Sequence, residues 1–477
     1  MGNSLALTLP EIILTLSSLG LLMLSAYTDD RHARLATWIA VATFAVAIGW
    51  MPGVTGPGGV GFDGLYIADD FAAFSKVLIY IAAAVAMIAA TSWFARDGVY
   101  RTEYPVLILL SSVGMGMMVS AGDLLTLDIG LELQSLAAYV LASFQRKDAR
   151  SAEAGLKYFV LGALASGILL YGISLLYGFT GTTLFSGASA GLAGGVSTGE
   201  LFGIVFVLAG IAFKVSAVPF HMWTPDVYEG APTPVTAFFA SAPKVAAMAL
   251  LVRVAVEAMG PATFEWRQII IFMALASTIL GGVAAIGQPN IKRLLAYSSI
   301  NNVGFALIGL AAGTREGVAS VMFYMAVYVA MTLGSFLCVM RMRDEAGQPV
   351  ESIASLSGLS RTRPLLAAAL AMFMFSLAGI PPLFGFWPKF LVFNAAVAAD
   401  LTWLAAVGIA TSVIGAFYYI KIVKVMYFDE PAPAYEVSKD RVEGWLIAAA
   451  ALFVSPLGYF SIPLIDAAAQ NAARALF

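Results

Sequence analysis

Four charged side chains, Glu132, Lys214, Lys244 and Lys389, each interrupt a long apolar stretch of this sequence. Apolar runs of about 20 residues are long enough to cross a lipid bilayer. A charge at bilayer depth costs roughly 3 kcal/mol on insertion scales, and such residues usually mark a path for ions or protons. One acid and three lysines at separate points of the chain therefore predict a proton relay.

Lys214 and Lys244 have no acidic residue within one helical turn, so each needs a partner from another part of the chain. Burial favours the neutral amine of a lysine, whereas a nearby carboxylate favours the ammonium. Moving a carboxylate would therefore switch a buried lysine between holding and releasing a proton. We expect Glu132 to be the partner of Lys214, and the alternative is a static buried ion pair.

Three further side chains are weaker candidates for the same relay. Lys157 follows Glu153 by four residues, a spacing that also suits a simple ion pair on one helix. His221 titrates near neutral pH and could shuttle protons, although a lone histidine is often only hydrogen-bonded. Tyr297 begins a polar run that could hold water between charged sites or pack one helix against another.

Two other charges within apolar runs are interpreted as structural. Arg253 precedes Glu257 by four residues, and Lys76 follows Asp69 and Asp70 by one or two helical turns. Both lie within reach of a local carboxylate on the same helix.

The composition indicates an all-α polytopic membrane protein, because 60% of the 477 residues are hydrophobic and only 12% are charged. A formal net charge of −3 gives no reason to expect nucleic acid as a partner. Cys338 is the single cysteine, and there are two histidines. These counts exclude a disulfide framework, a cysteine-ligated iron–sulfur cluster and a thiolate zinc site. We expect no cofactor and no metal in this chain.

Apolar runs predict about 14 membrane-spanning helices. With that threading, 17 of the 26 lysines and arginines fall in odd-numbered loops and 3 in even-numbered loops and termini. Basic residues are retained in the cytoplasm, so both termini are expected on the periplasmic side of a bacterial inner membrane. The predicted units are residues 1–100 (helices 1–3), 101–260 (helices 4–8), 261–430 (helices 9–13) and 431–477 (helix 14).

Helices 7 and 12 are predicted to be broken. Residues 364–398 would form a helix of about 52 Å, too long for one span and too short for two with a turn. Prolines interrupt this stretch at Pro381 and Pro382, and residues 200–229 contain a similar pattern of residues around Pro219. Matching breaks five helices apart predict two inverted five-helix repeats, the design of many secondary transporters. The alternative is that the prolines only kink helices for packing.

Several motifs carry a resemblance to a known family: Phe213–Thr233, Gly130–Leu136, Lys292–Ser299 and Gly379–Phe390. They closely resemble the antiporter-like, proton-translocating subunits of respiratory complex I, NADH:quinone oxidoreductase, which are similar to Mrp-type antiporter subunits. The resemblance covers nearly the whole chain. Within the family the chain most resembles the subunit N branch, because it lacks a long lateral helix and has Lys389 where the subunit M branch has glutamate.

The resemblance implies a proton-pumping translocase without a redox site of its own. It assigns Glu132 and Lys214 as an ion pair, Lys244 as the central lysine and Lys389 as the terminal lysine, with Lys157 as the helix-six lysine and His221 as a bridging histidine. NADH, FMN, iron–sulfur clusters and quinone are expected in partner subunits, with subunits M and K as neighbours in the bilayer. One position departs from the family pattern: many relatives have histidine where this chain has Asn302. A Mrp-type cation/proton antiporter subunit is the rival interpretation.

Overall fold

The computed structural model describes residues 2–52, 58–436 and 440–477, which are predominantly helical. Lys439, one of the basic loop residues counted above, lies outside this part of the chain. The longer helices are α2 (Leu9–Thr28), α3 (Ala33–Gly49), α4 (Asp70–Arg96), α5 (Glu103–Val119), α6 (Leu124–Ala142), α7 (Ala149–Thr180), α9 (Thr198–Val215), α12 (Ala242–Arg253), α13 (Thr263–Ile286), α14 (Ile291–Ala311), α15 (Arg315–Met340), α17 (Pro364–Ala378), α18 (Phe386–Ala398), α19 (Thr402–Phe428), α20 (Arg441–Val454) and α21 (Ile462–Arg474).

Short elements connect these helices. They are α1 (Gly2–Leu7), α8 (Phe185–Leu192), α10 (Trp223–Gly230), α11 (Thr233–Phe239), α16 (Leu359–Thr362), and the single turns η1 (Asp29–His32), η2 (Phe62–Gly64), η3 (Val254–Ala258), η4 (Gly260–Ala262), η5 (Ile353–Leu356) and η6 (Pro456–Ser461). Strands β1 (Gly59–Gly61) and β2 (Tyr66–Ala68) form one antiparallel hairpin, with Gly59 opposite Ala68.

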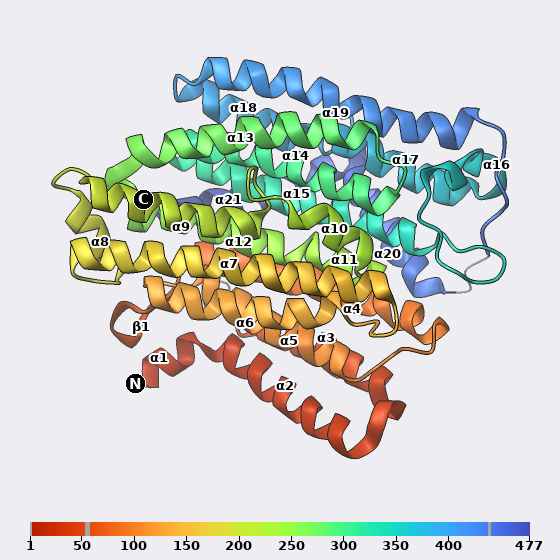
Figure 1. Ribbon diagram of the computed structural model, residues 1–477, viewed down its shortest axis with the longest axis horizontal. Helices are drawn as coiled ribbons and strands as arrows, with labels where there is room; N and C mark the ends of the chain where they lie inside the picture. The colour runs from red at the N-terminus through yellow and green to blue at the C-terminus, as the bar shows by residue number, and fades with distance from the viewer. Residues whose placement is uncertain (1, 53–57, 437–439) are drawn as a thin grey trace.

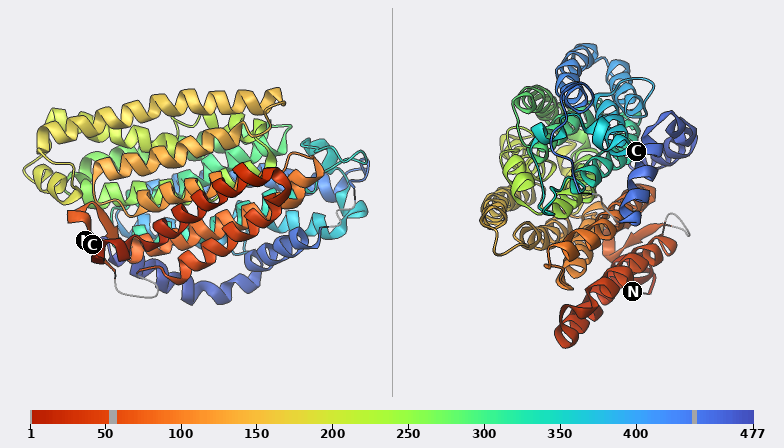
Figure 2. Two further views of the ribbon diagram at one scale, coloured as in Figure 1. Left: turned by 90° about the horizontal axis from the view of Figure 1, so that it is seen from below. Right: turned by 90° about the vertical axis from the view of Figure 1, so that its right-hand side faces the viewer.

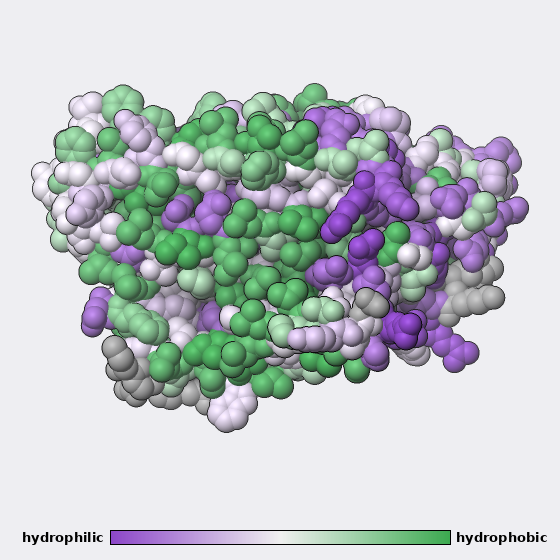
Figure 3. Space-filling view, turned by 60° about the horizontal axis from the view of Figure 1, so that its bottom comes forward, coloured by the Kyte–Doolittle hydropathy of each residue, from purple (hydrophilic) through white to green (hydrophobic). Residues whose placement is uncertain are grey.

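The long helices lie side by side along one axis of the molecule (Figure 1). Helix α2 lies at one edge of the bundle and α19 at the other, and the last helices, α20 and α21, return to pack against α15 and α4 (Figures 1 and 2). Both termini, together with α8 and the hairpin, lie at the same end, and α16 lies at the opposite end. On the face seen in Figure 3, hydrophobic side chains cover the middle, and hydrophilic ones gather toward the α16 end. This distribution suits a bundle that crosses a bilayer.

Eleven helices of the described residues are long and apolar enough to cross a membrane, or twelve if the bent pair α20 and α21 is one span. The polytopic helical class predicted from composition is therefore confirmed. Helices α5, α17 and α18 are apolar but shorter. The count of 14 and the repeat arrangement stay predictions.

Two expected helices are interrupted by proline. Predicted helix 8 is divided into α11 and α12 at Ser241, where Pro243 begins the second part and places Lys244 in its first turn. Predicted helix 14 bends by 70° between α20 and α21, next to Pro456. In both cases the missing proline N–H ends the hydrogen-bonded ladder.

Glycines allow neighbouring helices to approach closely at two comparable places. A Cβ on Gly114 of α5 would lie 2.4 Å from Gln134 N of α6, and one on Gly281 of α13 would lie 2.7 Å from Asn301 N of α14. Such contacts exclude any larger side chain, and small residues are the usual means of helix association in a bilayer.

Candidate functional site

The first helix break separates α9 from α10. Helix α9 ends at Val215, and Ser216 adopts a left-handed conformation with φ 68° and ψ 35°. The Ser216 N–H donates back to Ala212 O, which is a common way to close a helix C-terminus. Pro219 lies in the connection and cannot continue the helix, because it has no N–H. The break predicted within residues 200–229 is therefore present.

Lys244 reaches from α12 into this break. Its buried Nζ donates to Val215 O at 2.9 Å and makes a second hydrogen bond to Ser216 Oγ. The ammonium also lies 5.3 Å from the ring centre of Trp223 and 5.9 Å from that of Tyr228. A helix C-terminus carries partial negative charge, and aromatic faces attract cations. Lys244 therefore has a carbonyl, a hydroxyl and two aromatic faces that suit a cation, and no carboxylate of the described residues forms an ion pair with it.

The second break separates α17 from α18. Helix α17 ends at Ala378, Gly379 adopts the left-handed conformation with φ 79°, and the chain becomes helical again at Phe386. The backbone repeats the first break: Pro219 is the third residue after the left-handed Ser216, and Pro382 is the third after Gly379. The helix ends set this register, in which Pro219 corresponds to Pro382.

Lys389 occupies the second break as Lys244 occupies the first. Its buried Nζ donates to Leu377 O and Ala378 O, both at 3.0 Å, and to Ser412 Oγ at 3.2 Å. Ala378 O and Val215 O are equivalent, since each belongs to the residue before the left-handed one. The two lysines therefore cap the C-termini of two corresponding half-helices.

Lys214 is buried at the end of α9 and points toward α6. Its Nζ donates to Ser135 Oγ at 2.6 Å and to Tyr139 OH at 3.2 Å. Glu132 lies on the same helix, one turn before Ser135, but among the described residues no carboxylate oxygen comes within 4 Å of Lys214 Nζ. Glu132 and Lys214 thus lie in the same region, but Lys214 contacts the hydroxyl groups of Ser135 and Tyr139 rather than the Glu132 carboxylate.

Among the described residues, none of the three weaker candidates is hydrogen-bonded to Lys244 or Lys389. Lys157 forms ion pairs with Glu153 at 2.7 Å and Asp226 at 2.9 Å, and its side chain is 40% exposed. His221 is half-buried in the first break, and in the described part of the chain no hydrogen bond joins it to Lys214 or Lys244. Tyr297 is likewise only half-buried on α14.

A buried cluster of hydroxyl and amide groups surrounds α14, which packs against both α10 and α18. Ser299 and Tyr328 are hydrogen-bonded at 2.8 Å, and Asn302 binds Tyr324 and Tyr419. The polar run after Tyr297 predicted the α14 members of this cluster. Sequence reasoning missed the tyrosines, although the spacing of Tyr324 and Tyr328 by four residues in an apolar helix was an available signal.

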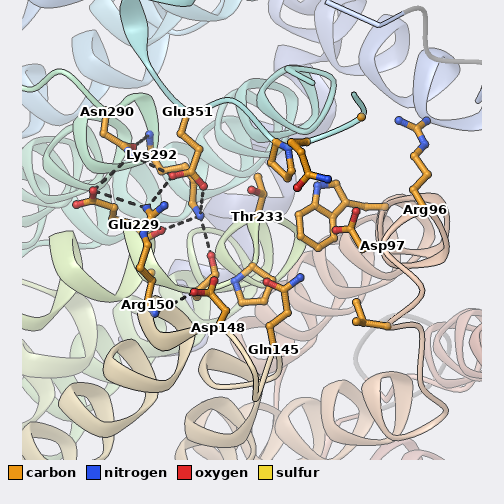
Figure 4. A pocket seen from close by; sticks show the side chains of 18 of the residues that line it. Arg96, Asp97, Gln145, Asp148, Arg150, Glu229, Thr233, Asn290, Lys292 and Glu351 are labelled. Atoms are coloured by element: carbon orange, nitrogen blue, oxygen red, sulfur yellow. Dashed lines mark hydrogen bonds and ion pairs between the residues drawn. The ribbon is translucent and has the colours of Figure 1, made fainter. Parts of the chain in front are cut away.

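A cavity of about 830 Å³ is lined by charged side chains that include Arg150, Lys292 and Glu351 (Figure 4). Lys292, buried beside it, donates to Glu229 O at 2.9 Å, to Ala231 O at 2.7 Å and to Glu351 at 2.9 Å. Arg150 binds the other oxygen of Glu351 at 2.9 Å. Burial alone would raise the pKa of Glu351, but Lys292, Arg150 and Asn290 outweigh it and lower that pKa to about 2.

Two more buried charges join helices near the opposite end of the bundle. Lys76 pairs with Glu11 at 2.6 Å, so the expectation that Asp69 or Asp70 would neutralise it is wrong. Arg253 pairs with Glu257 as predicted, at 2.9 Å, and also with Asp69 at 2.6 Å. The unexpected partners come from distant parts of the chain, which helical spacing does not reveal.

Comparisons with known proteins agree with this geometry. Residues 121–415 match the family described as NADH:quinone oxidoreductase/Mrp antiporter, transmembrane. The chain is 72% identical over 479 residues to NADH-quinone oxidoreductase subunit N of Rhizorhabdus wittichii, covering 100% of both proteins. A chain of respiratory complex I from Thermus thermophilus with bound aureothin is 30% identical, with a TM-score of 0.82, over 95% of this chain and 98% of that one. A chain of the Mrp complex from Dietzia shares the fold, with a TM-score of 0.82 at 22% identity over 99% and 97% of the two chains.

Proposed function

This chain belongs to the NADH-quinone oxidoreductase subunit N family, and from that premise we propose that it is a proton-translocating membrane subunit of an NADH:quinone oxidoreductase. The observation that carries the proposal is the pair of buried lysines, Lys244 and Lys389, each of which caps an interrupted helix. Ionisable groups at broken helices are typical of membrane transport sites.

In the proposed mechanism, electron transfer from NADH to quinone takes place in other subunits and perturbs Glu132. A change in Glu132 alters the field at Lys214 through the hydroxyls of α6, because Ser135 and Tyr139 hold that ammonium. Lys214 then binds its proton less tightly, and a proton passes from it through Lys244 to Lys389. Proton uptake from the cytoplasm and release on the outside complete the cycle. The carbonyl groups at each helix end favour the charged form of the lysine that caps it. In the proposed mechanism, each of these lysines therefore holds a proton between transfers. Lys157, His221 and Tyr297 play secondary parts.

The proposed architecture has 14 spans and two inverted repeats. Fourteen results if α5 counts as a short span, α17 with α18 as one broken span, and α20 with α21 as another. The repeats are helices 4–8 within residues 101–260 and helices 9–13 within residues 261–430, flanked by residues 1–100 and 431–477. Equivalent lysine caps and glycine contacts at the first two helices of each half support this division.

The proposed location is a bacterial inner membrane with both termini in the periplasm. Both termini lie at one end of the bundle, and hydrophilic side chains gather toward the other (Figures 1 and 3). Retention of basic residues in the cytoplasm supports this orientation. The proposed neighbours are subunits M and K, and NADH, FMN, iron–sulfur clusters and quinone belong to partner subunits.

Replacing Lys244 with methionine in the assembled complex tests the proposal. Methionine keeps the length of the side chain but carries no proton, so proton pumping and coupled turnover should fall while assembly persists. Lys421→Met is a matched control, because Lys421 is exposed and its Nζ has only a 3.4 Å contact with Ile286 O. Equal pumping by the two variants, at the parent rate and stoichiometry, would refute the assignment.

The second candidate is a Mrp-type cation/proton antiporter subunit, which the shared fold favours. Purification of the chain from native membranes separates the two functions. Copurifying NADH:quinone activity supports the complex I assignment, whereas sodium-dependent transport without redox subunits supports the antiporter.

A further inference from the structure

Lys292 is another buried lysine that binds the end of a helix. It lies in the first turn of α14, beside the cavity shown in Figure 4, and is almost fully buried. Its Nζ donates to Glu229 O at 2.9 Å and to Ala231 O at 2.7 Å, both at the C-terminus of α10, and to Glu351 at 2.9 Å. An ammonium has three hydrogens, so all three are in use. Lys292 therefore caps α10 in the way that Lys244 caps α9.

Helix α10 is short, and no longer helix continues it at either end. It has eight residues, it follows the first break, and it stops at Ala231, which adopts an extended conformation with φ −68° and ψ 152°. Its position therefore depends on the contacts that it makes. Arg293, next to Lys292 on α14, adds ion pairs from its Nη1 to Asp226 at 2.6 Å and to Glu229 at 3.0 Å. Two neighbouring cations of α14 thus hold α10, one through its backbone and one through its side chains.

Helix α10 carries the two aromatic rings that lie beside Lys244. The Lys244 Nζ is 5.3 Å from the ring centre of Trp223 and 5.9 Å from that of Tyr228. Tyr228 is followed directly by Glu229, whose carbonyl oxygen accepts from Lys292. The ring and the capped carbonyl belong to consecutive residues, so a movement of the helix end also moves the ring. Aromatic faces stabilise a cation, and they do so more strongly at a desolvated site.

We propose that Lys292 is a positioning residue for Lys244, because it holds the end of α10 so that Trp223 and Tyr228 face the Lys244 ammonium. The inference rests on the proposed function and deepens it. In this role Lys292 transfers no proton, and its own ammonium stays paired with Glu351. Without the cap, α10 moves into the adjoining cavity, which its own residues line. The rings then stabilise the ammonium less, and the fraction of Lys244 that holds a proton falls.

The first experiment compares Lys292→Met with Arg343→Met in the whole complex, reconstituted into liposomes. Arg343 is a matched control because it is also a buried cation that binds residues of the same cavity. Its guanidinium donates to Asp97 at 2.8 Å and to Gly347 O at 2.6 Å, and none of its partners among the described residues lies on α10. Both variants therefore remove a buried charge, and only Lys292→Met releases α10.

We expect Lys292→Met to pump protons about tenfold more slowly per assembled complex, and Arg343→Met to pump at the parent rate. A tenfold change corresponds to about 1.4 kcal/mol, which lies within the range of cation–π attraction at desolvated sites. Glu351 keeps Arg150 at 2.9 Å and Asn290 at 3.0 Å as partners in Lys292→Met, so the complex should still assemble. If it does not, Lys292→Gln takes its place in the same comparison.

A second experiment asks whether Lys292 acts through α10. Lys292→Arg keeps a cation that can donate to both carbonyl groups and to Glu351, so it should recover most of the pumping rate. Tyr228→Leu removes one of the two rings, and its control, Tyr228→Phe, keeps the ring. Residues that act through one another give non-additive free energies. Lys292→Met combined with Tyr228→Leu should therefore slow pumping by less than the product of the two single effects.

Two outcomes would overturn the positioning role of Lys292. One is pumping by Lys292→Met, or by Lys292→Gln in its place, at the Arg343→Met rate. The other is a double variant whose loss equals the product of the two single losses, which is the result expected if Lys292 only supports the fold. Lys244→Met separates this inference from the proposed function. If Lys244→Met pumps normally, the proposed function fails; if Lys244→Met is impaired and Lys292→Met is not, only the positioning role fails.

Discussion

Gly379→Ala directly tests the capped lysine at the second break. Gly379 has φ 79°, a conformation that L-residues rarely adopt, and a Cβ at this position would lie 2.8 Å from Lys389 Cδ and 3.2 Å from its Nζ. Such contacts are too short to persist, so the lysine side chain must move. The direction of movement is away from the helix end that Lys389 caps.

Two free energies add in this variant. The left-handed conformation costs an alanine roughly 1 to 2 kcal/mol. Displacement of Lys389 also weakens its hydrogen bonds to Leu377 O and Ala378 O, and a hydrogen bond to a charged group contributes about 1.5 to 3 kcal/mol. Losing one such bond would slow a step that depends on this lysine by about 10 to 100-fold.

Gly98→Ala is the matched control. Gly98 has φ 66°, but a Cβ there would meet nothing within 4 Å. Both variants should therefore lose a similar amount of thermal stability from backbone strain, and only Gly379→Ala should lose proton pumping in reconstituted liposomes. If Gly379→Ala pumps at the rate of Gly98→Ala, the contacts of Lys389 at the break are irrelevant to transport and the reasoning is wrong.

Three further outcomes follow from the ion pairs. Arg253→Met should destabilise the complex by about 3 to 5 kcal/mol, because Asp69 would be left as an uncompensated charge; a thermal melt that matches the parent would contradict this. Glu351→Gln removes a carboxylate whose pKa is lowered to about 2 despite its burial, mainly by Lys292. The stabilising effect of the carboxylate is complete above its ordinary pKa of about 4.3 and is lost as the pH falls toward 2, so the melting temperatures of parent and variant should converge over that range. Lys157→Met should slow pumping far less than Lys244→Met, because Lys157 is 40% exposed and already paired; equal losses would place it in the main route.

The positions of the buried lysines and of the helix breaks were predictable because both are local properties. A lysine in an apolar run is visible in the sequence, and proline ends a helix wherever it removes an N–H from the ladder. The pairing of Arg253 with Glu257 was predictable for the same reason, since residues four apart share one face of a helix. The pairing of Lys76 with Glu11 was not, because α2 and α4 are adjacent only after folding.

Hydropathy and helical periodicity act over a few neighbouring residues, so the membrane environment, the helical class and the charged residues that a bilayer must accommodate can be read from the sequence. What those charges contact depends on how the helices pack. Lys244 and Lys389 bind backbone carbonyls. Every residue has a carbonyl, so the side-chain types in the sequence do not predict these contacts. The carbonyls are available only where a helix end is turned toward the lysine. Asn302 likewise acquires its orientation from Tyr324 and Tyr419, which three packed helices bring together.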